Sequence, residues 1–352
     1  MLRCAASGRI DSGCAKLVRM LAVFGGGAWL ATSAPACDGE RPGALATLAG
    51  GTGAGPWVVS HGGATSPPET IDGVEAAADT ALAALAKGAS VLEAAIAGTV
   101  VLEDDSRFNA GRGSNIRLDG KTIQMDAALT TDAGEFAAVA AIERVRNPIR
   151  AAALVLRSPH VLLAGEGATR FAHQMGLPDE VPESEGARER LQERLARLAR
   201  ELGRDPEVLD WRDYWNFPGE MPAELRAWRE AGDTVGTVTR DAAGHFAATL
   251  STGGTSVTLY GRVGDVPVLG AGLFAGPAGA VACTGDGEEI IRRLLARSVY
   301  ASLEQGEPAA RAVERAVAAF PAEHGVGIIA LDSAGWGVAS NRKMAFAHAP
   351  RR

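Results

Sequence analysis

The feature that most constrains the fold of this chain is an alternation of strand pairs and helix pairs in its C-terminal half. A turn sequence between two segments of strand composition predicts a β-hairpin, and this pattern occurs twice, at 234–252 and 326–339. Between the hairpins lie two segments, 288–304 and 308–320, whose apolar residues recur at helical spacing. The C-terminal half therefore predicts two strand pairs separated by two helices.

The N-terminal half has a similar order of elements. A capping box at Ser90–Glu93 marks the start of a helix, and Asp119–Gly120 predicts a two-residue hairpin turn. The expected elements are a strand at 57–60, helices at 71–87, 90–102, 148–156 and 167–175, paired strands within 115–125 and a strand at 137–142. Such pairs in both halves predict an α+β fold, a four-layer αββα sandwich in which helices cover two stacked sheets.

The segment 177–232 differs from its surroundings because it is rich in Arg and Glu. Within it, residues 187–202 place leucines on one helical face, which predicts an amphipathic helix with a solvated charged side. A cluster of aromatic residues follows at Trp211–Trp215. We expect this cluster to make core or docking contacts rather than to form a binding patch.

The N-terminal segment has the pattern of a targeting sequence. Lys16 and Arg19 precede an apolar stretch at 21–31, which is too short to span a membrane comfortably, and small residues follow up to Cys37. This pattern predicts a signal sequence at 1–36 and export to the periplasm. Cleavage after Ala36 would leave Cys37 at the new N-terminus, where a lipid anchor is an alternative, and a start assigned too early in the chain is another.

The segment that follows, 37–56, is rich in Gly, Ala and Pro without a period, which predicts a flexible linker. The folded part is then expected to begin near Trp57. Three of the four cysteines precede it, so Cys283 is the one thiol expected in the core. The formal net charge is −7 and basic residues alternate with acidic ones, so no basic stripe is present that would bind a nucleic acid.

The strongest chemical signals are four short glycine-containing motifs. They are Gly232-Asp-Thr-Val-Gly236, Ser251-Thr-Gly-Gly254, Gly261-Arg-Val-Gly-Asp265 and Thr284-Gly-Asp-Gly-Glu288. Each has an ordinary structural explanation when taken alone, since threonine favours strands, a nearby Arg and Asp often form a surface ion pair, and glycines often begin helices. Their significance therefore depends on their order and spacing.

Together with the segments 61–64, 108–113, 146–149 and 158–168, these motifs resemble the plant-type asparaginase and isoaspartyl peptidase family. The resemblance extends from Trp57 to Ala347 and implies the fold of an N-terminal nucleophile hydrolase. It also implies self-cleavage between Asp233 and Thr234. The parts 57–233 and 234–352 would then become the α-subunit and the β-subunit of one hydrolase domain.

The resemblance also implies the catalytic residues. Thr234 would be the nucleophile, and the amino group that cleavage frees on it would be its general base, since such an amine has a pKa near neutrality. Thr252 would hydrogen-bond and orient the Thr234 hydroxyl, and Asn109 would lie beside the amine. The Thr284 hydroxyl and the Gly285 N–H would stabilise the oxyanion.

The substrate and ion contacts follow from the same resemblance. Arg262 would hold the α-carboxylate of the substrate and Asp265 its α-amino group, because an Arg fork can donate two parallel hydrogen bonds to a carboxylate. The same pocket would include Val263, Gly264 and Gly287. No cofactor is expected for catalysis. A structural sodium ion would be held by backbone carbonyls of Leu102, Glu103, Asp105, Phe108, Ala110 and Arg112.

The predicted function is a self-processing hydrolase for β-aspartyl dipeptides and L-asparagine, assembled as a homodimer of αβ units. The chain departs from the family pattern where Asp233 and Thr65 replace glycines, where Val257-Thr258 replaces Asn-Lys, and in the longer segment 177–231. Because Asp-Thr is the cleavage pair of glycosylasparaginases, hydrolysis of N-acetylglucosaminyl-asparagine is one alternative. An exported binding protein that is never processed is another.

Overall fold

The computed structural model describes residues 47–117, 119–201, 203, 233–255 and 258–351, which belong to one compact unit, Arg41–Arg352. The predicted signal sequence, Cys37, the aromatic cluster at Trp211–Trp215 and Val257 lie outside the described residues. Within the described part, no helix is both long and apolar enough to cross a membrane.

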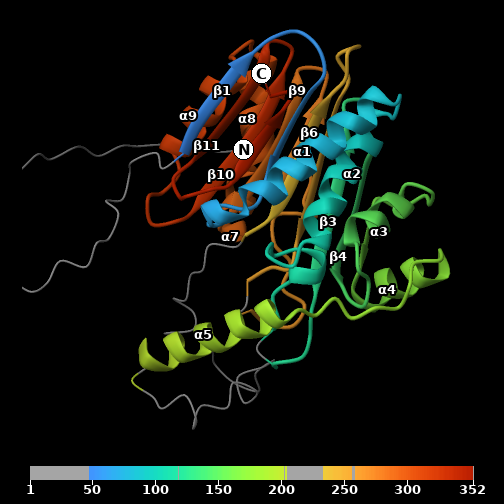
Figure 1. Cartoon of the computed structure of the whole chain (residues 1–352), viewed down its shortest axis with the longest axis vertical. Helices are drawn as coiled ribbons and strands as arrows, with labels where there is room; N and C mark the ends of the chain where they lie inside the picture. The colour runs from blue at the N-terminus through green and yellow to red at the C-terminus, as the bar shows by residue number, and fades with distance from the viewer. Residues whose placement is uncertain (1–46, 118, 202, 204–232, 256–257, 352) are drawn as a thin grey trace, which may run out of the picture. The chain divides into compact units, whose positions relative to one another are not determined.

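Two β-sheets form the centre of this unit (Figure 1). The first has the strand order β1 (Thr47–Thr52), β11 (Gly335–Ser340), β10 (Val326–Asp332), β9 (Gly279–Gly285) and β8 (Leu273–Gly276). The second has the order β12 (Phe346–Ala349), β2 (Trp57–His61), β6 (Val235–Arg240), β7 (Phe246–Thr252), β3 (Met125–Thr131), β4 (Phe136–Ile142) and β5 (Leu162–Ala164). Neighbouring strands are antiparallel except β4 and β5.

The two sheets pack face to face through alternate residues of their strands. Val238 and Leu250 of the second sheet belong to the same buried cluster as Ile329 and Val338 of the first. The side chains of a strand point alternately to its two faces, so the intervening residues of the same strands face the helices. This arrangement brings β6, β7 and β9 together at the centre of the molecule.

Helices cover the outer face of each sheet (Figure 1). The helices α1 (Ile71–Ala86), α2 (Val91–Asp104), α3 (Pro148–Val155) and α4 (Gly165–Gln174) lie against the second sheet. The helices α8 (Leu295–Glu304) and α9 (Ala309–Ala318) lie against the first. The α+β fold predicted from the sequence, an αββα sandwich, is confirmed.

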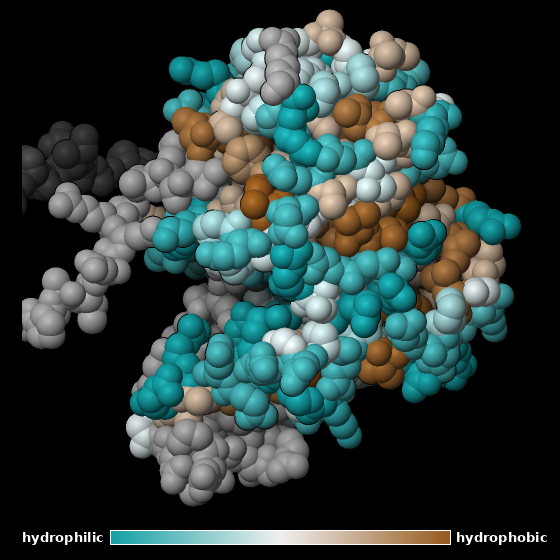
Figure 2. Space-filling view, in the orientation of Figure 1, coloured by the Kyte–Doolittle hydropathy of each residue, from teal (hydrophilic) through white to brown (hydrophobic). Residues whose placement is uncertain are grey.

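Several local predictions are also confirmed. Strand pairs β6–β7 and β10–β11 are hairpins around the expected turns. The capping box of α2 is complete, with the Ser90 hydroxyl accepting from Glu93 N–H at 3.2 Å and the Glu93 carboxylate accepting from Ser90 N–H at 2.9 Å. The amphipathic helix α5 (Glu185–Glu201) buries Leu191, and the region where it lies in Figure 1 is mostly hydrophilic on the face seen in Figure 2. Cys283 is a free, buried thiol.

The predicted linker at 37–56 is wrong in its last part, because Thr47–Thr52 forms β1 at the edge of the first sheet. Two glycines make this pairing possible, since a Cβ on Gly50 would lie 2.7 Å from Ala310 Cβ and one on Gly51 would lie 2.5 Å from Trp336 Nε1. The strand thus depends on contacts with distant residues, and its own sequence has no strand period. The folded part consequently begins before Trp57.

The single helix predicted at 288–304 is wrong as well. The structure has two helices, α7 (Gly287–Arg293) and α8, separated by Leu294 in a left-handed conformation with φ of 45°. The first N–H groups of α8 bind elsewhere, because Ala296 donates to Ala271 O at 3.0 Å and Arg297 to Gly270 O at 2.8 Å. These tertiary hydrogen bonds replace the ones that would continue a straight helix.

The paired strands predicted within 115–125 do not form among the described residues of this segment, which exclude Leu118. A turn is present, in which Arg117 N–H donates to Thr122 O at 2.8 Å and the Asp119 carboxylate accepts from Thr122 N–H at 2.8 Å, but the strand β3 starts only at Met125. The buried Arg117 side chain explains the difference, because it donates to backbone carbonyls of Gly253, Thr255 and Gln124. The strands β5, β8, β9 and β12 were not predicted.

Candidate active site

Thr234 is buried and lies immediately before β6, at the end of the second sheet's central hairpin. Val235 pairs with Ser251, so the neighbouring Thr252 at the end of β7 lies beside Thr234. Thr284 and Gly285 come from the end of β9 in the first sheet. The site therefore stands where strand ends of both sheets meet, and the predicted catalytic residues are brought together.

The carbonyl oxygen of Asp233, just before Thr234, accepts two side-chain hydrogen bonds. Asn109 Nδ2 donates to it at 2.8 Å and Thr252 Oγ1 donates to it at 3.3 Å. The Thr252 contact differs from the expected hydrogen bond to the Thr234 hydroxyl, because in the intact chain the peptide carbonyl is present as an acceptor. Two donors on one carbonyl oxygen stabilise the negative charge that develops there when a nucleophile attacks the carbon.

The Thr284 hydroxyl lies on the other side of the peptide bond. It accepts hydrogen bonds from the N–H groups of Thr234 and Ala64, each at 3.2 Å. Gly285 has φ of 136°, and a Cβ on it would lie 2.1 Å from Gly325 O, so only glycine fits this position. Of the two residues expected to form the oxyanion hole, Thr284 is thus adjacent to Thr234, and Gly285 follows it at the end of β9.

Arg262 has a partner that the sequence analysis did not single out. Its Nε and Nη2 donate to the two carboxylate oxygens of Glu288 at 2.9 and 2.8 Å. Glu288 lies in the first turn of α7, whose N-cap is Asp286. The guanidinium has five N–H donors, and this contact uses two of them. The remaining donors include the two N–H groups of Nη1. This nitrogen lies over Gly264, and a Cβ placed on Gly264 would be 2.9 Å from it.

Asp265 is buried, and its Oδ2 has no hydrogen-bond partner among the described residues. Burial raises the pKa of its carboxyl to about 7, against the lowering effect of Arg262. Its other oxygen, Oδ1, lies 2.8 Å from where a Cβ on Gly287 would stand, and Arg262 Nη2 lies 2.9 Å from the same point. A buried carboxylate oxygen without a donor is costly unless a ligand supplies one.

The loop that carries these residues is held by a buried carboxylate. Asp126 Oδ2 accepts from Gly264 N–H at 3.1 Å, and Asp126 Oδ1 accepts from Ala141 N–H at 2.7 Å. Val263 is half-buried between Arg262 and Gly264. Arg262, Asp265 and Gly287 therefore converge as predicted, with Asp126 as an additional support from β3.

Two further buried ionisable side chains support the site, those of Glu103 and Arg117, and the sequence analysis assigned no role to either side chain. Glu103 accepts from Ser251 Oγ at 2.7 Å and from Ile149 N–H at 2.9 Å, and burial raises its carboxyl pKa to about 8. Arg117 lies beneath the Gly253–Gly254 turn. Glu103 directly follows the predicted helix 90–102 and precedes two aspartates, so the sequence gives no signal that its side chain is buried.

The loop expected to hold sodium begins at the end of α2. Its first two expected ligands, the carbonyls of Leu102 and Glu103, are in the last turn of the helix, where carbonyls lack helical donors and the helix dipole favours a cation. The Asp105 and Ala110 carbonyls accept from backbone N–H groups at 3.1 and 3.0 Å. The carbonyl of Phe108 lies 1.9 Å from where a Cβ on Gly113 would stand. The loop backbone is thus closely packed, and carbonyl oxygens are the type of ligand that a hard cation prefers.

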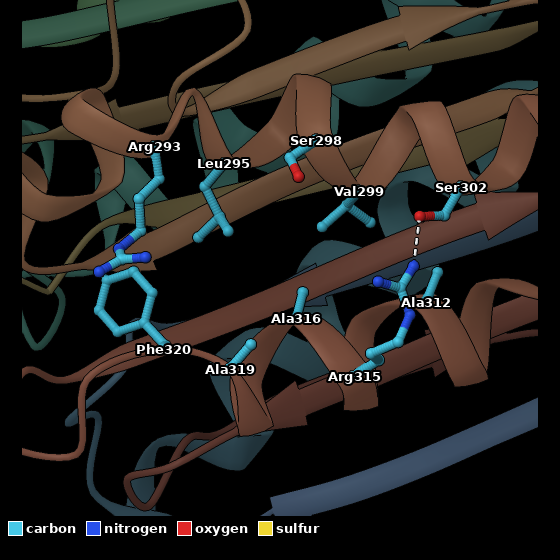
Figure 3. A pocket seen from close by; sticks show the side chains of 10 residues that line it. All are labelled: Arg293, Leu295, Ser298, Val299, Ser302, Ala312, Arg315, Ala316, Ala319 and Phe320. Atoms are coloured by element: carbon cyan, nitrogen blue, oxygen red, sulfur yellow. Dashed lines mark hydrogen bonds between the residues drawn. The ribbon is translucent and has the colours of Figure 1, made fainter. Parts of the chain in front are cut away.

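A separate cavity of about 260 Å³ lies between α8 and α9 (Figure 3). Arg315 Nη2 donates to Ser302 Oγ at 2.6 Å at one end, and the Arg293 guanidinium stacks over Phe320 at the other. None of the predicted site residues lines this cavity. In the part of the chain that the structure describes, no three His, Cys, Asp or Glu side chains are grouped so that they could hold a metal ion.

Comparison with known proteins places the chain in a family. The family model described as asparaginase matches residues 50–351. The plant-type L-asparaginase of Pyrococcus furiosus is 39% identical over 301 residues, which cover 81% of this chain and 93% of the relative. The isoaspartyl peptidase/L-asparaginases of Danio rerio and Homo sapiens are 37% and 35% identical, over 75% and 74% of this chain and 81% and 80% of their own lengths. The chain therefore belongs to the asparaginase family of N-terminal nucleophile hydrolases.

Proposed function

We propose that this protein cleaves its own Asp233–Thr234 bond and then hydrolyses side-chain amides of aspartate, with L-asparagine and β-aspartyl dipeptides as substrates. The observation that carries the proposal is the pair of hydrogen bonds from Asn109 and Thr252 to the Asp233 carbonyl oxygen. They lie where attack by the next residue's hydroxyl would place negative charge. The names of the relatives support the amide substrates.

Self-cleavage begins when the Thr234 Oγ attacks the Asp233 carbonyl carbon. The peptide bond to Thr234 N breaks, the chain is joined transiently through an ester, and water hydrolyses the ester. The products are a carboxylate on Asp233 and a free amino group on Thr234. Asn109 and Thr252 stabilise the oxyanion of this step, because they already bind the oxygen that becomes charged.

Substrate hydrolysis then uses the new amine as general base. It takes the proton of the Thr234 hydroxyl while Oγ attacks the side-chain carbonyl carbon of the substrate, and it returns a proton to the leaving amine. The resulting ester on Thr234 is hydrolysed by water, which releases aspartate. Thr284 and Gly285 would stabilise the oxyanion, with Arg262 and Asp265 holding the α-carboxylate and the α-amino group of the substrate.

The glycosylasparaginase alternative is motivated by Asp233, which replaces the glycine of the plant-type pattern. The deciding assay offers asparagine, a β-aspartyl dipeptide and N-acetylglucosaminyl-asparagine to the processed protein. Preference for one of the first two supports the proposal, and preference for the glycosylated compound contradicts it. A chain that stays intact and binds aspartate derivatives without turnover would support the binding-protein alternative.

We further propose that the loop after α2 binds sodium, that the enzyme is a homodimer of αβ units, and that it is exported. The close backbone packing around Gly113 supports the sodium site, and the targeting pattern of segment 16–37 supports export.

Each of these three proposals has its own test. Replacing sodium by a bulky organic cation should lower the melting temperature of the protein if the site is structural. Sedimentation of the processed protein tests the dimer. Fractionation of cells tests export, and a cytoplasmic chain that starts at Met1 would contradict it.

A further inference from the structure

Two departures from the family's sequence pattern contact one another directly. Asp233 Oδ1 accepts hydrogen bonds from Thr65 N–H at 2.7 Å and from Thr65 Oγ1 at 2.6 Å. The chain comes close at this point, because a Cβ on Gly63 would lie 2.7 Å from Asp233 Cβ. Thr65 is exposed, so the contact stands at the open side of the site. Glycines at 65 and 233 would provide neither the hydroxyl nor the carboxylate.

The third departure, the longer segment that contains α5, supplies two arginines near the same place. Arg190 Nη2 donates to Gly113 O at 2.6 Å, and Arg194 Nη1 donates to Asn115 Oδ1 at 3.0 Å. Asn115 N–H in turn donates to Asn109 Oδ1 at 2.9 Å. The helix is thus fixed to the loop that carries the Asn109 side chain, next to the Asp233 carbonyl.

The charges of these arginines reach the Asp233 side chain. Burial raises the pKa of the Asp233 carboxyl, and the Thr65 hydrogen bonds and the charges of Arg194 and Arg190 oppose this rise. Both arginines are half-buried, with the positive charge directed to carbonyl and amide oxygens of the loop. A carboxylate of the chain therefore already occupies a position defined by two donors of Thr65, and α5 holds two cations on the neighbouring loop.

We propose that Thr65, Arg190 and Arg194 form an anion site beside Thr234, which the Asp233 side chain occupies before cleavage and which then binds the free carboxylate of the amino acid that leaves from a β-aspartyl dipeptide. This inference rests on the proposed function, because a leaving amino acid exists only if such dipeptides are substrates. Self-cleavage frees Asp233 from its bond to Thr234, so the carboxylate that occupied the site can be exchanged.

The location suits the leaving group. The aspartyl half of the substrate has its own charged pair, Arg262 and Asp265, in the loop held by Asp126. Thr65 follows Ala64, whose N–H donates to the Thr284 hydroxyl at 3.2 Å, so it stands next to the expected oxyanion position. In the leaving amino acid the carboxylate carbon is two bonds from the scissile nitrogen, so its carboxylate must lie close to that position. Asparagine releases ammonia and gains nothing from this site.

The test compares three substrates on the processed enzyme: β-aspartyl-leucine, β-aspartyl-leucinamide and L-asparagine. The two dipeptides have the same shape and differ in the charge of the terminal group. We expect kcat/KM for the acid to exceed that for the amide by about tenfold, since charge-assisted hydrogen bonds are the stronger ones. Rates are divided by the concentration of cleaved chains measured on a denaturing gel.

The variant Arg190→Gln/Arg194→Gln should reduce the acid-to-amide ratio to near one, so that kcat/KM falls more for the acid than for the amide or for asparagine. Gln keeps a donor on each side chain and removes the charge. Arg188→Gln is the matched control, because Arg188 is an exposed arginine of the same helix that pairs with Glu183, and it should keep the wild-type ratio. Thr65→Ala should lower the ratio in the same direction. An equal fall in all three rates would show a structural role and overturn the anion site.

The outcomes separate this inference from the function on which it rests. If the wild-type enzyme cleaves both dipeptides at equal rates, or if the ratio survives in the double variant, the anion site is wrong and the dipeptide function stands. If asparagine is hydrolysed and neither dipeptide is, both the dipeptide assignment and the anion site are wrong.

Discussion

The two flanks of Thr234 are built in different ways. On one flank, Arg262 and Asp265 lie in a short loop whose backbone is held by the buried Asp126, and both belong to the motif at 261–265. On the other flank, Asp233 binds Thr65, and the arginines of α5 bind the neighbouring loop; these residues belong to departures from the family pattern. On our proposal, the first flank serves the aspartyl group common to all substrates and the second serves the leaving group, which varies among them.

The largest effect is expected from Asn109→Ala, which acts where the flanks meet. The change removes the 2.8 Å hydrogen bond to the Asp233 carbonyl oxygen, and loss of one oxyanion donor typically slows a reaction by about 10²–10³-fold. The rate of appearance of the two fragments on a denaturing gel measures this. Cleavage at the wild-type rate would mean that the Asn109 side chain does not stabilise the oxyanion of self-cleavage.

The next effect concerns the first flank alone. Arg262→Lys keeps the charge but cannot donate two parallel hydrogen bonds to a carboxylate, so kcat/KM should fall by more than about tenfold, or about 1.4 kcal/mol. Self-cleavage should be normal, because Asp233 is bound by other residues. Arg293→Lys on α7 is the control and should behave as wild type. Wild-type kinetics of the processed Arg262→Lys protein would show that Arg262 does not bind the substrate.

The first flank should also contribute to the acid limb of the pH profile, together with protonation of the Thr234 amine, whose reference pKa is near neutrality. The Asp265 carboxyl has a pKa raised to about 7, so it is ionised above this pH and protonated below it. Because only the ionised form attracts the substrate's α-ammonium group, kcat/KM should fall as pH decreases through about 7. A profile for asparagine that stays flat down to pH 5 would contradict the role given to Asp265.

The smallest effect is expected from Glu288→Gln. The glutamine can still contact Arg262, so we expect a rise of a few-fold in KM with little change in kcat. Because the charge of Glu288 helps to raise the pKa of Asp265, the acid limb should also move to lower pH. An unchanged acid limb together with an unchanged KM would show that Glu288 is only a surface partner of Arg262.

The sequence predicted those parts of the fold that are determined locally. The hairpin β6–β7 has turn residues between alternating strands, and α2 has its capping box, so each signal lies within a few residues. The strand β1, the break at Leu294 and the absent strands at 115–125 depend instead on partners far away in the chain. Short-range patterns do not contain that information.

The same distinction holds for the candidate site. Thr234, Thr252 and Arg262 could be predicted because each lies in a motif with a fixed spacing. Glu288 was part of a quoted motif, but its contact with Arg262 spans 26 positions and is visible only in the fold. Thr65 and Asp233 are 168 positions apart in the chain. The sequence therefore did not indicate that these two departures from the family pattern form a hydrogen-bonded pair.

The central claim is that Thr234 becomes the N-terminal residue of the active enzyme, and intact mass spectrometry of the purified protein tests it most directly. For the wild-type protein we expect two chains, one ending at Asp233 and one starting at Thr234. For Thr234→Ala we expect a single uncut, inactive chain. An active wild-type protein with an unbroken Asp233–Thr234 bond, or fragments of the same masses from Thr234→Ala, would contradict it.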